Sequence, residues 1–239
     1  MNTLTAQETG DHEFSVAQTP LAHMTPSTGI GCLLNDGLAS SHPMSIVVKV
    51  SLDLVLASML LVLTAPVISI AALLIKLTSH GPIIYRQQRI GRGGKRFAIL
   101  KLRTMMQDAE QRLPEQPSCV RFIKFHNDFR ITPVGRFLRK TSIDELPQLI
   151  NVLRGEMSLV GPRPLVQKEV DALPWPAWVT RYRVQPGITG LWQVSGRNNT
   201  TDSERLQMDI DYVRNWSLLL DLKIMLKTIP AIIYGRGAY

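Results

Sequence analysis

An unbroken run of 22 uncharged residues, Leu54–Ile75, most constrains how this chain can fold. It is long enough for a helix that crosses the hydrocarbon of a bilayer, which needs about 20 apolar residues. Pro66 lies near its middle, where a proline removes one helical hydrogen bond and bends the axis. Thr64 offers a hydroxyl to the carbonyls so freed. We therefore expect a membrane helix with a kink at Pro66.

The charges on the two flanks of this run restrict its direction. Lys49 precedes the run, and Lys76 and Arg86 are the first of several basic residues that follow it. Basic flanks favour the cytoplasmic side, so a straight span would place one flank outside. A re-entrant helix, which enters and leaves through the same leaflet, satisfies both flanks; a tilted, kinked span is the alternative. Lys49 and Asp53 lie one helical turn apart and are expected to pair.

Composition and charge divide the chain into regions. The 239 residues are 45% hydrophobic, which is enough for a real core. Residues 1–48 contain four acidic residues and no lysine or arginine, so the rest of the chain carries +12 and the overall net charge is +8. A basic domain suits anionic lipid, phosphorylated substrates or nucleic acid, but aromatic residues are only 6% and no nucleic-acid recognition motif is present. We expect a flexible tail (1–43), a membrane helix (44–79) and a cytoplasmic domain (80–239), with no nucleic-acid partner.

Asp144 and Glu145 stand side by side before an apolar helical pattern. Pro147 argues against a capping box that begins at Ser142, because the proline would then be the fifth helical residue. With Asp144 as the N-cap, Pro147 falls within the first turn, and both carboxylates lie at the positive end of the helix dipole. A purely structural cap is the other interpretation.

Basic residues surround this acidic pair in the sequence, and the turn at residues 161–164 (Gly-Pro-Arg-Pro) presents one of them rigidly. They are Arg136, Arg139, Lys140, Arg154 and Arg163. Guanidinium forks suit phosphate oxygens. Phosphoryl transfer requires such a set: one carboxylate to attack phosphorus or activate a nucleophile, another to hold a divalent metal, and cations to take up phosphate charge. The sequence therefore predicts a phosphoryl-transfer site around Asp144.

Residues 83–100 are typical of a β-hairpin that turns at residues 91–94 (Gly-Arg-Gly-Gly). Lys101 and Arg103 follow it and would project to one face of an extended chain. Two cations on one face need a partner, so we weigh contact with a diphosphate against a solvated edge.

Two features near the C-terminus allow alternative interpretations. Asp209 is either an acidic site residue or the ion-pair partner of Arg205 or Arg214. Residues 216–234 carry apolar side chains at helical spacing with lysines alongside. This helix is expected either to pack into the core or to lie in the plane of an anionic leaflet.

Together these motifs resemble the bacterial sugar transferase family, the monotopic polyprenol-phosphate phosphoglycosyl transferases that begin exopolysaccharide and O-antigen repeat units. The resemblance extends from about Val47 to the C-terminus. It includes the hairpin block, the acidic pair, the Gly-Pro-Arg-Pro turn and the segment at residues 185–197. It implies a mostly helical α+β fold with a re-entrant membrane helix and a cytoplasmic catalytic domain. That domain would carry amphipathic interfacial helices and a small β-hairpin.

The resemblance also implies an activity. The expected reaction moves a sugar 1-phosphate, galactose or glucose 1-phosphate, from a UDP-sugar to undecaprenyl phosphate and releases UMP, as the first step of exopolysaccharide repeat-unit assembly. Asp144 would form a covalent phosphosugar intermediate, and Glu145 would bind Mg²⁺. The cations expected to bind substrate are Lys101, Arg103, Arg139, Arg163 and Arg197.

The same resemblance places the enzyme at the inner leaflet of the bacterial cytoplasmic membrane, and a homo-oligomer stays open. The alternative is a catalytically inactive membrane-bound subunit that interacts with, or regulates, a polysaccharide assembly complex.

Overall fold

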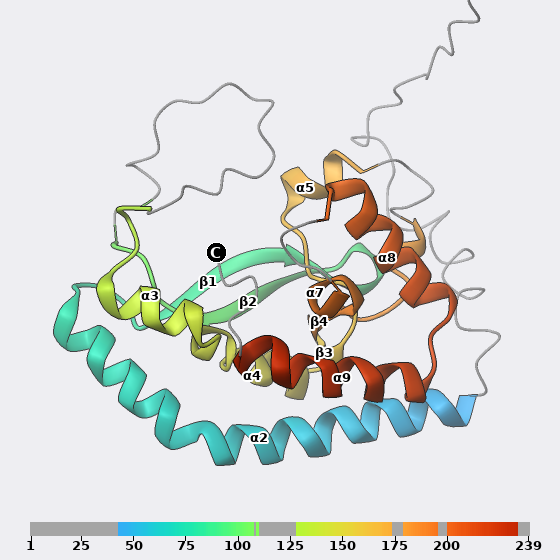
Figure 1. Ribbon diagram of the computed structural model, residues 1–239, viewed down its shortest axis with the longest axis horizontal. Coiled ribbons are helices and arrows are strands. Elements are labelled where there is room, and N and C mark those ends of the chain that lie inside the picture. The colour runs from blue at the N-terminus through green and yellow to red at the C-terminus, as the bar shows by residue number, and fades with distance from the viewer. Residues whose placement is uncertain (1–42, 108, 110–127, 174–178, 196–199, 234–239) are drawn as a thin grey trace, which may run out of the picture.

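A long apolar helix underlies the rest of the chain. The structure is a computed structural model and describes residues 43–107, 109, 128–173, 179–195 and 200–233. Its first element, α2 (Pro43–Thr78), is long and apolar enough to cross a membrane. Pro66 lies inside α2 without ending it, and Figure 1 shows α2 curved, with both ends turned toward the rest of the chain. Residues 1–42 of the expected tail lie outside the described residues.

Thr64 differs from its expected role. Its hydroxyl donates to the carbonyl of Leu60 (2.6 Å), whereas the carbonyl that Pro66 frees is that of Val62. The reason is local geometry, because a helical threonine reaches only the carbonyl three or four residues before it.

One face of α2 packs against the domain along most of the helix. Asp53, Ala57, Ala71 and Ile75 are buried there. The other face exposes large aliphatic side chains, among them Val55, Val62, Leu63, Ile70, Leu73 and Leu77. Since a stripe of this size is costly to leave in water, the exposed face indicates contact with lipid.

The predicted hairpin is confirmed. β1 (Ile84–Ile90) pairs antiparallel with β2 (Arg96–Leu102), and the short helix η2 (Arg92–Gly94) makes the turn. Gly93 and Gly94 have φ values of 67° and 76°, a left-handed conformation that glycine adopts without steric cost.

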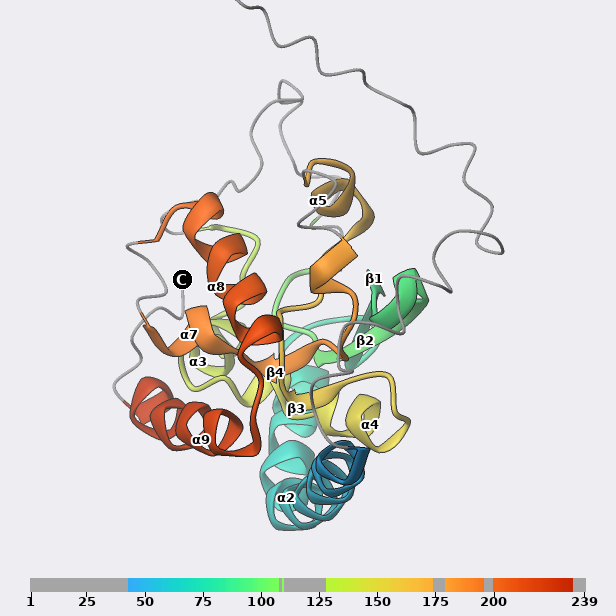
Figure 2. The ribbon, with the colours of Figure 1, turned by 90° about the vertical axis from the view of Figure 1, so that its right-hand side faces the viewer.

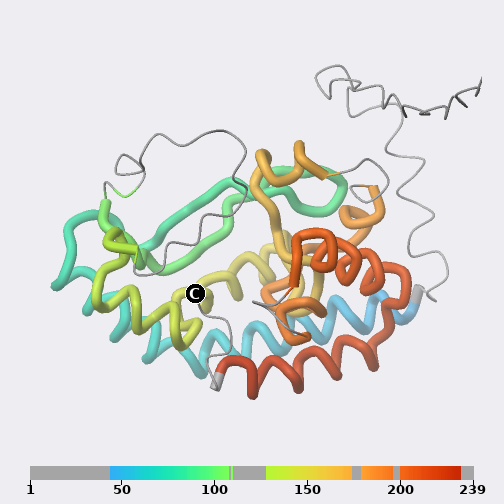
Figure 3. Tube along the Cα trace, turned by 45° about the horizontal axis from the view of Figure 1, so that its top comes forward, coloured from blue at the N-terminus to red at the C-terminus, as the bar shows by residue number. Residues whose placement is uncertain are grey.

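Short helices carry the acidic pair. α3 (Pro133–Lys140), η3 (Ile143–Glu145) and α4 (Gln148–Leu153) follow one another in the chain. In Figure 3 the yellow-green segment with α3 and α4 runs between the hairpin and α2, and α4 contacts both α2 and β2. The acidic pair is therefore held between α2 and the hairpin.

Asn151 on α4 fixes this helix against the edge of β2. Its side-chain oxygen accepts from the backbone N–H of Leu100 (3.0 Å), and its amide donates to the carbonyl of Ala98 (2.8 Å). Asn151 is fully buried, so these bonds replace those that its amide would make with water. The position of α4, and with it the acidic pair, depends on this side chain.

A second small sheet brings together two motifs that are distant in sequence. β3 (Ser158–Val160) runs parallel to β4 (Gly187–Thr189). A Cβ atom at Gly187 would lie 2.1 Å from the backbone nitrogen of Gly161, so only glycine permits this approach. Gly161 also donates to the carbonyl of Thr189 (2.9 Å). The Gly-Pro-Arg-Pro turn therefore lies directly against β4.

The remaining helices complete a mostly helical α+β fold, as expected for the described residues. They are α5 (Gln167–Asp171), α7 (Leu191–Ser195), α8 (Asp202–Arg214) and α9 (Leu218–Ile233). Figures 1 and 2 place α2 and α9 along the same face of the molecule. On α9, Ile224 is buried, while Leu222, Leu226, Lys223 and Lys227 are exposed. The helix thus has an inner apolar face and an outer surface that combines apolar and basic side chains.

A buried polar network joins α2 to α9. The Nζ atom of Lys49 lies 3.1 Å from Asp53 and 2.8 Å from Asp221. Ser158 donates to Asp53 (2.7 Å), and the Tyr212 hydroxyl donates to Asp221 (2.8 Å). The predicted Lys49–Asp53 pair is confirmed, and Asp221 extends it. Two carboxylates and one ammonium can be buried here because each has a partner.

Candidate active site

Asp144 and Glu145 lie in η3, at the entrance to α4. Ser142 precedes the turn with a φ of 56° and makes no side-chain cap bond. The expectation that Asp144 caps the helix is wrong in detail, since Pro147 occupies the N-cap position of α4. The missing N–H of Pro147 explains this register, because a proline is tolerated only where the helix has unpaired donors. Asp144 is buried, whereas Glu145 is partly exposed.

Two of the cations predicted to bind substrate interact with this acidic pair. Lys101, on β2, places its Nζ atom 2.6 Å from Oε1 of Glu145. Arg139, on α3, donates from Nε to the hydroxyl of Thr104 (2.9 Å), and its charge acts on Asp144. The strand and the helix thus supply one cation each.

The pKa of Asp144 is strongly perturbed. Burial raises it to about 6, the charge of Glu145 raises it as well, and Lys101 and Arg139 act in the opposite direction. A carboxyl group with a pKa near 6 is mostly ionised at neutral pH and is more basic than a free aspartate. Both properties suit a nucleophile.

Arg103 takes a different position from Lys101. β2 ends at Leu102, so the alternation of side chains that would put both cations on one face does not continue. The Nη2 atom of Arg103 donates to the carbonyl and to the hydroxyl of Ser79, both at 2.8 Å. Burial lowers the pKa of this guanidinium. Arg103 therefore contacts Ser79, the residue that follows α2.

Arg163 is exposed, and Arg89 lies near it. Arg89 is not among the cations that the sequence predicts to bind substrate. Burial and the charge of Arg163 lower the pKa of Arg89, and the charges of Glu169 and Glu145 raise it. Arg89 also donates to the Pro164 carbonyl (3.1 Å). The only signal in the sequence was its place in the hairpin block. Arg89 thus lies largely buried beside Arg163 and is paired with Glu169 (3.4 Å).

A buried ion pair supports the turn that carries Arg163. Arg181 donates from Nε to Oδ2 of Asp209 (2.9 Å), and both side chains are buried. Its Nη2 atom also donates to the backbone carbonyl of Arg163. The predicted partners of Asp209, Arg205 and Arg214, are wrong: Arg181 comes from a segment that no local pattern links to α8.

Glu145 is the more exposed carboxylate of the acidic pair. Its side chain is 34% exposed and already attracts the ammonium of Lys101. Within the part of the chain that the structure describes, no group of three His, Cys, Asp or Glu residues could hold a metal. A Mg²⁺ ion would therefore depend on the acidic pair, water and substrate phosphates, which fits an ion that needs few protein ligands. The remaining candidate, Arg197, lies outside the described residues.

Comparisons with known proteins agree on one family. The model of the family described as "Bacterial sugar transferase" matches residues 44–235. The chain is 44% identical over 206 residues to the exopolysaccharide production protein ExoY of Rhizobium meliloti, with 83% of this chain and 91% of that protein covered. It is 47% identical over 195 residues to the UDP-glucose:undecaprenyl-phosphate glucose-1-phosphate transferase of Caulobacter vibrioides, with 79% and 70% covered.

A third relative is named for another sugar. The undecaprenyl-phosphate galactose phosphotransferase of Salmonella typhimurium is 43% identical over 201 residues, with 80% of this chain and 41% of that protein covered.

Proposed function

The chain belongs to the bacterial sugar transferase family and is a phosphoglycosyl transferase, and from this premise we propose its reaction. The enzyme transfers galactose 1-phosphate or glucose 1-phosphate from a UDP-sugar to undecaprenyl phosphate and releases UMP. Support for the two sugars comes from the relatives, which are named for glucose and galactose. The relative with the exopolysaccharide name supports a role at the start of repeat-unit assembly.

The observation that carries this proposal is the environment of Asp144. Its carboxyl group is buried, has a pKa of about 6 and adjoins a second carboxylate. Cations from β2 and α3 act on it. A structural cap has no need of this arrangement, whereas a nucleophile that attacks an anionic phosphate needs nearby positive charge.

In the first step, an oxygen of Asp144 attacks the phosphorus that bears the sugar, and the bond from that phosphorus to the UMP oxygen breaks. In the second step, a phosphate oxygen of the lipid attacks the same phosphorus and releases Asp144. Lys101, Arg139 and Arg163 hold the phosphate oxygens through both steps. Mg²⁺ bound to Glu145 would supply further neutralisation of diphosphate charge.

Transfer in two steps suits substrates from different phases. The donor is soluble in water and the acceptor is anchored in lipid, and a phosphosugar stored on Asp144 means that they need not bind together. The acidic pair lies between α2 and the hairpin, and this position supports transfer in two steps.

The packing of α2 supports a re-entrant helix. Asp53 and Ile75 are both buried against the domain, and 22 helical residues separate them by about 33 Å. An α2 that crossed the bilayer would carry this charged domain into the hydrocarbon, which is prohibitively costly. A helix bent near Pro66, with both ends at the inner leaflet, leaves the domain in the cytoplasm.

Release of UMP from a panel of UDP-sugars tests this proposal. The purified full chain is incubated with undecaprenyl phosphate, Mg²⁺ and UDP-glucose, UDP-galactose or their N-acetyl analogues. With one of the two hexoses we expect repeated release of UMP that depends on the acceptor, beyond the single equivalent per enzyme released when the intermediate forms. A chain that releases no UMP with any donor would instead be the inactive subunit, an alternative that the intact acidic pair disfavours.

A further inference from the structure

A cleft opens on the side of the molecule away from α2 and α9. It is lined by Arg163, Leu165, Glu169, Leu173, Arg181, Trp192, Asp202, Arg205, Leu206 and Asp209. In Figure 1, α5 and α8, which contribute to it, lie opposite α2. With α2 at the membrane, this cleft faces water, the phase from which a nucleotide arrives.

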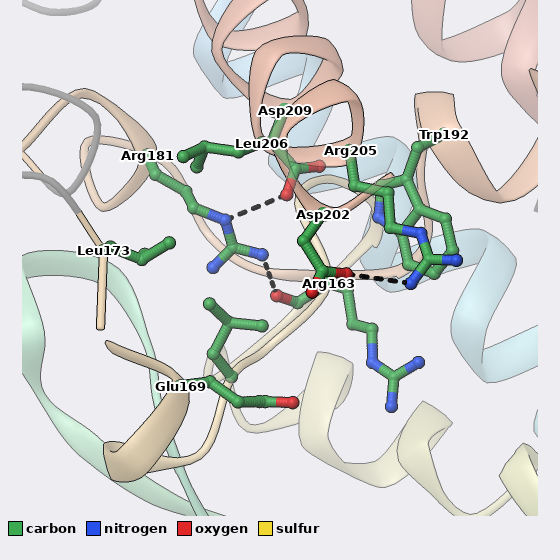
Figure 4. A pocket seen from close by; sticks show the side chains of 10 residues that line it. Arg163, Glu169, Leu173, Arg181, Trp192, Asp202, Arg205, Leu206 and Asp209 are labelled. Atoms are coloured by element: carbon green, nitrogen blue, oxygen red, sulfur yellow. Dashed lines mark hydrogen bonds and ion pairs between the residues drawn. The ribbon is translucent and has the colours of Figure 1, made fainter. Parts of the chain in front are cut away.

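Arg163 lines this cleft and is also one of the cations expected to bind substrate phosphate. Burial raises the pKa of Asp209, in the cleft wall, and the charges of Arg181 and Arg163 act in the opposite direction. Burial and the charge of Arg163 lower the pKa of Arg89, and Glu169 and Glu145 raise it. Figure 4 shows the Arg163 side chain pointing away from the Arg181–Asp209 pair. In the proposed reaction, a diphosphate held at Arg163 has its reacting phosphorus toward the acidic pair, which leaves its other end toward the cleft.

The cleft contains a flat cationic surface. The guanidinium of Arg205 lies over the ring of Trp192, with Cζ 5.1 Å from the ring centroid. Thr200 and Asp202 orient it, because Nε bonds to the Thr200 hydroxyl (3.1 Å) and Nη1 to Asp202 (3.4 Å). Figure 4 shows this stack at one end of the cleft. Arginine planes of this kind stack with nucleobases.

The rest of the lining indicates whether the cleft suits the sugar or the base of the donor. Leu165, Leu173 and Leu206 give the cleft apolar walls. The carboxylates of the lining are each paired with an arginine, which leaves few polar partners for the hydroxyls of a hexose, whereas a planar pyrimidine with polar groups on one edge fits such walls. Asp202, at the edge of the stack, offers an acceptor for the N3–H that uracil has and cytosine lacks.

We infer that this cleft binds the uracil of the donor nucleotide, stacked on the guanidinium of Arg205 over Trp192. The inference deepens the proposed function and rests on it for the identity of the donor. Arg205 and Asp202 are then determinants of nucleotide specificity, and the sugar lies on the other side of Arg163.

UMP binding to the full-length protein in detergent, measured by calorimetry, tests the inference. Arg205→Ala is expected to weaken UMP binding by about tenfold or more, the usual effect of losing one base-stacking contact. Arg205→Lys keeps the charge without the plane and should weaken it similarly. Arg214→Ala is the matched control, because it removes an exposed arginine from the same helix; it should leave the Kd within about twofold of wild type.

Measurements of turnover distinguish a failure of this inference from a failure of the proposed function. With UDP-sugar, Arg205→Ala should raise KM about tenfold and leave the phosphosugar able to form at saturating donor. Asp202→Asn should narrow the preference for UMP over CMP. Unchanged UMP affinity in both Arg205 variants of an active enzyme overturns the inference alone. If the Arg205 variants lose UMP binding but the wild-type protein shows no turnover, the inference is supported and the proposed function is wrong. A wild-type protein that binds no UMP defeats both.

Discussion

The Nζ atom of Lys101 lies 2.6 Å from Oε1 of Glu145, so a cation from β2 neutralises one carboxylate of the acidic pair directly and the other at longer range. Lys101 lowers the pKa of Asp144, which burial and Glu145 raise. The carboxyl group of Asp144, the proposed nucleophile, is thus influenced by charges of opposite sign.

We predict that Lys101→Met moves the acidic limb of the pH–rate profile to higher pH. With the cation removed, the pKa of Asp144 rises above its value of about 6, so a smaller fraction is ionised at pH 6 to 7 and kcat falls there. The profile of kcat against pH measures this effect. Lys95→Met, at an exposed position near the hairpin turn, is the control. An acidic limb that stays in place in Lys101→Met would count against electrostatic control of Asp144.

We predict that Asp144→Asn stabilises the protein at pH 8 and abolishes turnover. Because the folded pKa is about 6 and the ordinary value is 3.8, folding favours the protonated form. Ionisation of Asp144 therefore removes stability as the pH rises from about 4 to above 6, by on the order of 3 kcal/mol. Thermal unfolding in detergent at pH 4 and pH 8 measures this. The gain should be present at pH 8 and nearly absent at pH 4; equal stability of both proteins at pH 8 would contradict it.

We predict that Arg181→Met is strongly destabilising and lowers activity. It leaves Asp209 buried without its ion-pair partner and removes the hydrogen bond to the Arg163 carbonyl. Breaking one half of a buried pair typically costs about 3 to 5 kcal/mol. Denaturant unfolding measures the cost, and the double variant Arg181→Met/Asp209→Leu should recover part of it. A double variant less stable than Arg181→Met would show that the pair has another role.

The sequence predicted those features that depend on local pattern. The charge-free run with Pro66 indicated α2, alternation and glycines indicated the hairpin, and Pro147 indicated that the acidic pair lies at a helix entrance. These signals arise from residues within a turn or two of one another, where backbone geometry dictates the outcome.

Contacts between distant segments could not be predicted in the same way. Arg181 and Asp209 lie 28 residues apart, and nothing near either one identifies its partner. The prediction that Arg103 and Lys101 share one face requires the strand to continue through both residues, but β2 ends one residue before Arg103. The packing of α3 and the hairpin decides which cations act on Asp144. The identity of these cations could therefore be learned only from the structure.

The most direct test of this account is whether the sugar phosphate becomes attached to Asp144. The full chain is incubated with UDP-hexose carrying radiolabel in the sugar, without acceptor, and the protein is then denatured and counted. We expect label on wild-type protein, its release when undecaprenyl phosphate is added before denaturation, and none on Asp144→Asn. Near-normal turnover by Asp144→Asn, or label retained equally by both proteins, would contradict the assignment of Asp144 as the nucleophile.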